Sequence, residues 1–364
     1  SRGLGDVYKR QILDGVFNHC GSFNKWMDRE RIYENQEGYP KGAYVSADSP
    51  YRNFFSFNDP NAWPYNTSYD GWWAHDTLPK LNYEGSRELY DYILRVGQKW
   101  VSAPYNVDGW RLDVAADLGH SNDFNHQFWK DFRKAVKAAN PNAIILAEHY
   151  GNPEGWLKGD EWDTVMNYPF YLNLIDLLAD EKITVSQFVQ NLGYLKGRLH
   201  KNCYPLMWNL IDSHDTARFL HLCNDNKKKQ HLAAAFQLLL PGMPMIYYGD
   251  EYAMPGANDP DCRRGMYWDE EYQDKEMYEW YKRLIQVRKS HACIVEGELA
   301  GSVTEDEEGT VVLIRKNGEE TIAMIFNCSS SAKKFNEYTQ KYNLLTENTF
   351  DGNVEGFDAA VIVL

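Results

Sequence analysis

Short apolar runs that alternate with longer helical stretches constrain the fold of this chain most strongly. Phenylalanine or valine recurs every four residues from Phe124 to Val136, which gives one apolar face and predicts a helix over Asp123–Asn140. Pro141 follows and ends that helix. Six apolar runs predict strands, namely Ile12–Phe17, Val107–Leu112, Ala143–Ala147, Thr164–Asn167, Leu206–Ile211 and Met243–Tyr248. This alternation is typical of a parallel sheet with helical crossovers, so we expect an α/β fold.

Several of these strands end in polar residues that can carry chemistry. The endings are Asn18-His19, Asp113, Glu148 and His214-Asp215. In a (β/α)8 barrel, residues at such positions lie on the C-terminal rim, where the loops after the strands build the active site. We therefore expect a (β/α)8 barrel whose first two strands would precede Ile12.

Changes in local composition along the sequence predict an inserted subdomain and a C-terminal domain. Residues 20–80 are rich in Tyr, Trp, Asn, Asp, Gly and Pro and far exceed an ordinary loop, so we expect an inserted subdomain after the third strand of the barrel. After a helix over Lys275–Lys289, short alternating strands are separated by Gly, Asn, Asp and Ser. We expect the barrel to occupy residues 12–290 and a C-terminal antiparallel β domain to occupy 291–364.

The first eleven residues differ in character from the rest of the chain. Asp6 to Gln11 can be back-translated to a string that resembles the transposon end used to build sequencing libraries. We therefore expect residues 1–11 to be a non-native leader, although a genuine flexible leader is the alternative interpretation.

Composition excludes some classes of partner. A formal net charge of -14 disfavours nucleic acid, which needs clustered Lys and Arg, but is compatible with a neutral ligand such as a sugar. No apolar run approaches the length that spans a bilayer, so we expect no membrane partner. The six cysteines show neither metal-type spacing nor a dense disulfide framework, which favours a cytoplasmic protein.

Four motifs together carry a resemblance to a known family. They are Asp14-Gly15-Val16-Phe17-Asn18-His19, Gly109-Trp110-Arg111-Leu112-Asp113, Ile145-Leu146-Ala147-Glu148 and Ser213-His214-Asp215. Their order and their places at strand ends resemble the four signature regions of glycoside hydrolase family thirteen, the α-amylase family, over essentially everything after Gln11. Each motif alone is weak, but the set is highly specific.

The resemblance implies three catalytic carboxylates. Asp113 would be the nucleophile, Glu148 the general acid and then base, and Asp215 the group that stabilises the developing oxocarbenium charge. Retaining cleavage needs the first two about 5–5.5 Å apart across the scissile bond. Arg111, two residues before Asp113 on the same strand face, would favour the carboxylate form of the nucleophile. The alternative for any one of them is an acidic residue that caps a following helix.

Further residues resemble the substrate contacts of the family. His19 and His214 would bond to hydroxyls of the sugar at the cleavage point, and the alternative is a structural histidine. Asp259 would grip sugar hydroxyls with Arg263 paired to it, and the alternative is a surface turn with an ion pair. Tyr150 would stack on a sugar in the leaving-group region, or is an ordinary packed tyrosine.

Other segments narrow the resemblance to one branch of the family. Trp72–Asn82, Leu157–Asp160, Val165–Tyr168 and Asn258–Arg263 resemble neopullulanases, cyclomaltodextrinases and maltogenic amylases. Such enzymes hydrolyse α-1,4-glucosidic bonds in maltodextrins, cyclodextrins, pullulan or starch by double displacement through a covalent glycosyl-enzyme. They often dimerise through an N-terminal β domain, so the intact protein could be a homodimer.

Cofactors and rival functions remain open at this point. The chemistry requires no cofactor, although Asn18 resembles a calcium ligand of other α-amylases and could hold Ca2+ or serve only as a hydrogen-bond anchor. A rival function is that of a non-catalytic relative, such as the barrel ectodomains of amino-acid transporter heavy chains, which lack the full carboxylate set. Another is an enzyme that mainly transfers glucans, since both reactions share the covalent intermediate.

Overall fold

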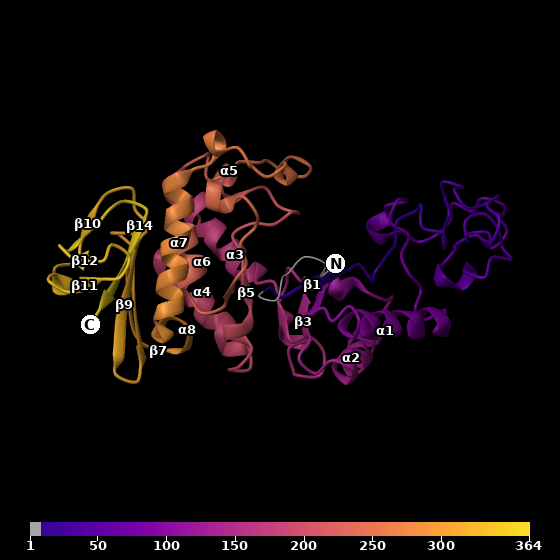
Figure 1. Ribbon diagram of the computed structural model, residues 1–364, viewed down its shortest axis with the longest axis horizontal. Helices are drawn as coiled ribbons and strands as arrows, with labels where there is room; N and C mark the ends of the chain where they lie inside the picture. Colours follow the sequence, from indigo (N-terminus) through magenta and orange to yellow (C-terminus); the bar gives the residue numbers. More distant parts are fainter. Residues whose placement is uncertain (1–8) are drawn as a thin grey trace. The chain divides into compact units, whose positions relative to one another are not determined.

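The computed structural model describes residues 9–364 and contains two compact units (Figure 1). Unit 1 ends at Val165, and unit 2 spans Met166–Leu364. Residues 1–8 of the predicted leader, residues 1–11, lie outside the described residues. The predicted domain boundaries at residues 11, 20, 80 and 290 stay predictions. Within residues 9–364, no helix combines the length and apolar character needed to span a bilayer.

A four-stranded parallel sheet organises unit 1. Its order is β1 (Ile12–Gly15), β2 (Gly109–Leu112), β3 (Ile144–Ala147) and β4 (Thr164–Val165). In the register, Leu112 pairs with Gly15 on one side and with Ala147 on the other. The last residues of the three strands are therefore aligned, so that the residues following β2 and β3 emerge side by side at the same edge of the sheet.

Two helices of unit 1 pack against each other, α1 (Arg87–Val101) and α2 (Asn122–Ala139). Ser86 and Ser121 accept hydrogen bonds from first-turn N–H groups and begin these helices as N-caps. Phe128, Phe132 and Val136 are fully buried along one face of α2, as their spacing predicts. Gly97 of α1 is needed for the close approach, because a Cβ atom there would lie 2.6 Å from the Phe132 ring.

Residues 20–80 contain neither an α-helix nor a β-strand. Two 3-10 turns, Arg52–Phe54 and Trp72–Ala74, and isolated bridges such as Gly71 with Pro79 supply its regular structure. A small interior, in which Met27 and Phe55 are buried, holds the segment together.

Helices dominate the first part of unit 2. They are α3 (Tyr168–Leu174), which continues as a π turn over Ile175–Ala179, α4 (Val185–Arg198), α5 (Phe219–Leu222), α6 (Lys227–Leu239), α7 (Lys275–Ser290) and α8 (Ala292–Glu296). A short parallel pair, β5 (Trp208–Asn209) with β6 (Met243–Pro244), lies among them. These strands are shorter than predicted. Met243 donates to the carbonyl oxygen of Met207, just before β5, and Met245 donates to that of Asn209 in β5. Pro244 has no N–H to donate, so it cannot support a further strand on the side of β6 away from β5.

The C-terminal part of unit 2 is antiparallel. Its six-stranded sheet has the order β12-β11-β14-β9-β8-β7, and β10 pairs with β13. The strands are β7 (Glu298–Glu305), β8 (Thr310–Asn317), β9 (Glu320–Asn327), β10 (Lys333–Lys334), β11 (Tyr342–Asn343), β12 (Asn348–Thr349), β13 (Asn353–Val354) and β14 (Asp358–Val363).

The two faces of β9 explain how this sheet is held. Ile322, Met324 and Phe326 point to a core shared with the helices, where Phe326 stacks on Phe236 of α6 at 4.2 Å between ring centroids. Ala323 and Ile325 point to a second apolar cluster. Alternation with a period of two along a strand thus builds both layers.

Candidate active site

The register of unit 1 brings two carboxylates to one edge of the sheet. Asp113 directly follows β2, and Glu148 directly follows β3. The backbone continues the ladder at this edge, because the N–H of Glu148 donates to the carbonyl of Leu112 over 2.9 Å. Leu112 and Ala147 are fully buried, so the chain can turn toward a polar environment only after these residues.

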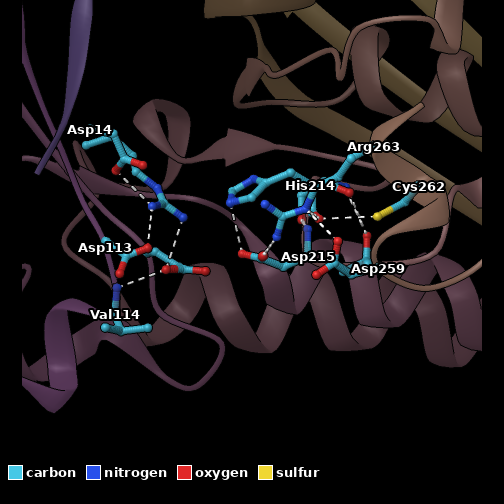
Figure 2. A network of polar contacts seen from close by, with 12 residues as sticks. Asp14, Asp113, Val114, His214, Asp215, Asp259, Cys262 and Arg263 are labelled. Carbon is cyan, nitrogen blue, oxygen red and sulfur yellow. Dashed lines mark hydrogen bonds and ion pairs between the residues drawn. The ribbon is translucent and has the colours of Figure 1, made fainter. Parts of the chain in front are cut away.

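Arg111 connects three carboxylates in unit 1 (Figure 2). Its Nη1 donates to Oδ1 of Asp113 at 2.7 Å and to Oδ1 of Asp14 at 2.9 Å. Its Nη2 forms an ion pair with Oε2 of Glu148 at 3.0 Å. Burial lowers the pKa of Arg111, but the charges of Glu148, Asp14 and Asp113 outweigh burial and raise that pKa above its ordinary value. The guanidinium therefore stays charged and holds the carboxylates by its two nitrogens.

Asp14 is a member of this network that the sequence did not single out. It pairs with Arg111 in the register of β1 and β2, on the same face of neighbouring strands. Its side chain is 52% exposed, whereas that of Arg111 is 11% exposed. The first motif opens on Asp14, and matching its place in β1 to Arg111 in β2 would have identified the contact.

A second contact of Glu148 comes from the turn after β2. The N–H of Val114 donates to Oε2 of Glu148 at 2.9 Å (Figure 2). The N–H of Ala115 donates to the carbonyl oxygen of Glu148 at 3.3 Å. Val114 adopts a left-handed conformation at φ 38° and ψ 47°. Only 4% of Glu148 is exposed. The turn and Arg111 thus fix one carboxylate oxygen of Glu148 from two sides.

His19 lies in a buried aromatic setting of unit 1. Nδ1 of His19 accepts from Nδ2 of Asn18 at 3.2 Å, which leaves Nε2 to carry the proton of the neutral ring. The His19 ring stacks on Trp72, with 5.2 Å between centroids and 14° between planes. Burial lowers the pKa of His19, and the charge of Asp113 opposes that effect only partly. His19 is therefore suited to donate a hydrogen bond as a neutral imidazole.

The predicted calcium position has one feature that suits a cation. Oδ1 of Asn18 is buried and has no hydrogen-bond partner within residues 9–364. However, Ca2+ takes about six to eight oxygen ligands, and the described residues contain no group of three His, Cys, Asp or Glu arranged for a metal. Lys80 forms an isolated β-bridge with His19, and its ammonium group donates a hydrogen bond to the carbonyl oxygen of Asp117 at 2.7 Å. Calcium at Asn18 stays a prediction.

Unit 2 carries a second polar network (Figure 2). Arg263 donates from Nη2 to Oδ1 of Asp215 at 2.8 Å and from Nε to the carbonyl oxygen of His214 at 2.9 Å. Its Nε is also 2.8 Å from Oδ1 of Asp259, so the ion pair expected between these two residues is present. Nε2 of His214 lies 3.1 Å from Oδ2 of Asp215. One guanidinium group therefore binds both the predicted catalytic carboxylate Asp215 and the predicted substrate-binding carboxylate Asp259.

The structure thus brings the predicted site residues together in two sets. Arg111, Asp113 and Glu148 form one set in unit 1, and the second lies in unit 2. The members of the second set are His214, Asp215, Asp259 and Arg263. Tyr150 is 45% exposed beyond β3, and its stacking on a sugar stays a prediction.

Comparisons with known proteins identify the family of the chain. A family model described as the alpha amylase catalytic domain matches residues 9–273. A cyclomaltodextrinase of Geobacillus thermopakistaniensis is 38% identical, over 89% of this chain and 52% of its own length. A neopullulanase 2 of Thermoactinomyces vulgaris is 35% identical, over 87% of this chain and 51% of its own length.

A solved structure has a fold similar to that of this chain. Cyclic alpha-maltosyl-(1→6)-maltose hydrolase from Arthrobacter globiformis superposes with a TM-score of 0.80 at 29% identity, over 97% of this chain and 75% of that protein. The predicted fold class, a partial (β/α)8 barrel with a C-terminal antiparallel β domain, is confirmed. The chain spans about half the length of the curated relatives it matches.

Proposed function

The chain belongs to the α-amylase family, and we propose that the protein it comes from hydrolyses α-1,4-glucosidic bonds with retention of configuration. The observation that carries this proposal is the bridge from one Arg111 side chain to both Asp113 and Glu148. A shared guanidinium keeps the two carboxyl groups within the reach of one side chain. That favours the short separation of about 5–5.5 Å that retaining enzymes use.

The proposed roles divide the reaction into two displacements. Asp113 attacks the anomeric carbon while Glu148 protonates the leaving oxygen, and a covalent glycosyl-enzyme forms. Glu148 then removes a proton from water, which attacks the same carbon and releases Asp113. Arg111 holds the nucleophile in place through its hydrogen bond of 2.7 Å to Oδ1 of Asp113. We assign to Asp215 the stabilisation of the oxocarbenium charge, by resemblance to the family.

Five further side chains are proposed to contact the sugar. His19 supports this role because its neutral ring offers an Nε2–H donor for a hydroxyl. His214, Asp259 and Arg263 supply further hydroxyl contacts, and Tyr150 supplies an exposed aromatic face beyond β3.

The substrate class is an α-glucan, from maltodextrins and cyclodextrins to pullulan or starch. The names of the two curated relatives, a cyclomaltodextrinase and a neopullulanase, support this choice. We further propose a cytoplasmic location, which six free thiols support. A homodimer of the intact protein is a separate proposal, which light scattering would test.

Trapping of the covalent intermediate tests the function. An activated fluoroglucoside, whose fluorine slows the second displacement, should lose its leaving group and add one fluoroglucosyl group to the peptide that contains Asp113. Asp113→Asn should abolish labelling, whereas Asp123→Asn, an exposed control on α2, should label like the parent protein. Labelling of another residue, or none with all carboxylates intact, would refute the proposal. Product analysis with added maltose would separate hydrolysis from transfer.

A further inference from the structure

Unit 2 buries three charged side chains behind the Asp215 segment. Asp212, Arg218 and Asp250 are each at most 1% exposed. Nη1 of Arg218 lies 3.2 Å from Oδ1 of Asp250, and Oδ2 of Asp212 accepts from the N–H of Phe219 at 2.8 Å. Buried charges are costly unless they are paired, so a cluster with two acids and one base requires a further explanation.

A single proton resolves the charge balance of this cluster. Oδ1 of Asp212 and Oδ2 of Asp250 are buried acceptors with no donor in residues 9–364. The negative charge of Asp212 acts on Asp250, so a proton on one of the two carboxyl groups removes the repulsion between them and supplies a donor to the cluster. Burial raises the pKa of Asp250 well above its usual range, and the negative charge of Asp212 adds to that effect. One carboxylate, one carboxylic acid and one guanidinium then sum to zero charge.

Other charged and titratable groups near Asp212 and Asp250 do not neutralise the second negative charge. Glu251, the next residue after Asp250, adds negative charge that raises the pKa of Asp250 further. Tyr281 of α7 is fully buried near both acids, and burial raises the pKa of its hydroxyl well above the usual range. Arg218 is the cation among the described residues whose charge lowers both pKa values, and it offsets the effect of burial only in part.

The cluster is tied to the backbone that carries the predicted substrate contacts. Nε of Arg218 donates to the carbonyl oxygen of Cys262 at 3.2 Å, and its Nη1 donates to that of Tyr248 at 2.8 Å. The N–H of Arg218 donates to the carbonyl oxygen of Gly256 at 2.9 Å. Cys262 immediately precedes Arg263, and its thiol donates to the carbonyl oxygen of His214 at 3.3 Å.

We propose that Asp212, Arg218 and Asp250 form a proton-sharing positioning unit, which holds the segment that carries Asp215 against the segment that carries Asp259 and Arg263. The three residues act through the backbone and do not touch the sugar. This inference rests on the proposed function only for the catalytic consequence. The shared proton and the tethering of the two segments can be measured without any enzymatic assay.

Paired asparagine variants test the shared proton. In Asp250→Asn a neutral amide replaces the carboxylic acid, and Asp212 remains as the carboxylate beside Arg218. In Asp212→Asn the shared proton is no longer needed, so Asp250 becomes the one carboxylate beside Arg218. Each single variant should therefore melt close to the parent protein and lose the infrared carbonyl band of a buried protonated carboxyl. The double variant leaves Arg218 without a counter-charge. Its melting temperature should therefore fall by much more than the sum of the decreases in the two single variants. Additive effects, or an unchanged infrared band, would overturn the shared proton.

Arg218→Lys tests the positioning role. An ammonium group cannot reproduce the planar fork that reaches two carbonyl oxygens and Asp250, so hydrogen exchange at residues 258–263 should accelerate. In the intact protein kcat should fall about 10-fold to 100-fold. Arg283→Lys, whose guanidinium pairs with Glu347 elsewhere in unit 2, is the matched control and should change neither measurement.

The outcomes separate this inference from the proposed function. Unchanged exchange in Arg218→Lys would overturn the positioning role, whether or not the protein cleaves glucans. Faster exchange at unchanged kcat and KM would also overturn it, because the held segments would not matter for the reaction. Absence of glucan hydrolysis in the parent protein, with the exchange and infrared results as expected, would refute only the proposed function.

Discussion

Val114 adopts an unfavourable left-handed backbone conformation in which its N–H donates a hydrogen bond to Glu148. Its N–H lies 2.9 Å from Oε2 of Glu148, at φ 38° and ψ 47°. A left-handed conformation is unusual for a β-branched residue and costs about 1–3 kcal/mol. Such strain persists only where the surroundings determine it, and here the turn after β2 is closed by Glu148 through its side chain and its carbonyl oxygen.

Val114→Gly should leave stability nearly unchanged. Glycine adopts positive φ without steric cost, but it gives up some burial and about 0.5–1 kcal/mol of backbone entropy. The free energy of unfolding, measured in urea, should therefore stay within about 1 kcal/mol of the parent value. Val114→Pro removes the N–H and requires negative φ, so it should destabilise the protein by about 3 kcal/mol or more. Equal effects of the two substitutions would show that the hydrogen bond to Glu148 does not matter.

Arg111→Met should be strongly destabilising. The substitution keeps most of the side-chain volume but leaves Asp113 and Glu148 without their shared cation, and only 4% of Glu148 is exposed. Loss of one partner from a buried charge pair costs about 3–5 kcal/mol. Urea denaturation at neutral pH should show a loss at the lower end of that range, because Asp14 is half exposed. Arg10→Met, which removes an exposed ion pair with Asp108, is the control and should have little effect.

Local patterns in the sequence account for much of this fold and site. The four-residue spacing of Phe128, Phe132 and Val136 fixed α2 to within one residue, because a helix places these side chains on one face. The ends of β2 and β3 followed from apolar runs that stop at Asp113 and Glu148, and parallel pairing then aligns the two ends.

Long-range contacts account for what sequence reasoning missed. Valine disfavours the left-handed region, and Val114 there donates its N–H to Glu148, 34 residues away. Aspartate is usually exposed on protein surfaces, yet Asp212 and Asp250 are both buried. Neither segment alone indicates burial, since the pair is tolerated only when it shares a proton beside Arg218.

His19 should make stability depend on pH below neutrality. Burial lowers its pKa below the ordinary value of 6.5, so the unfolded chain takes up a proton at higher pH than the folded protein does. The stability contributed by neutral His19 is therefore complete above about pH 6.5 and is lost as pH falls toward the folded pKa. Urea titrations of the parent protein should show an additional slope of up to about 1.4 kcal/mol per pH unit relative to His19→Gln.

The variant comparison isolates His19 from other histidines. Burial also lowers the pKa of His149, which therefore contributes a slope of the same sign to both proteins and cancels in the difference. Profiles that run parallel between pH values of about 5 and 7 would contradict a buried neutral His19.

Arg263→Lys should separate activity from stability. Arg263, Asp215 and Asp259 are 45%, 34% and 54% exposed, and exposed ion pairs contribute only about 0–1 kcal/mol. Thermal melting should therefore hardly change, whereas kcat/KM of the intact protein on maltodextrin should fall about 10-fold or more, because one ammonium cannot orient both carboxylates. Arg264→Lys is the matched control, since its guanidinium binds Asp261 in the same turn. If both substitutions lowered kcat/KM equally, the loss would reflect the shape of the turn, and the orienting role of Arg263 would be refuted.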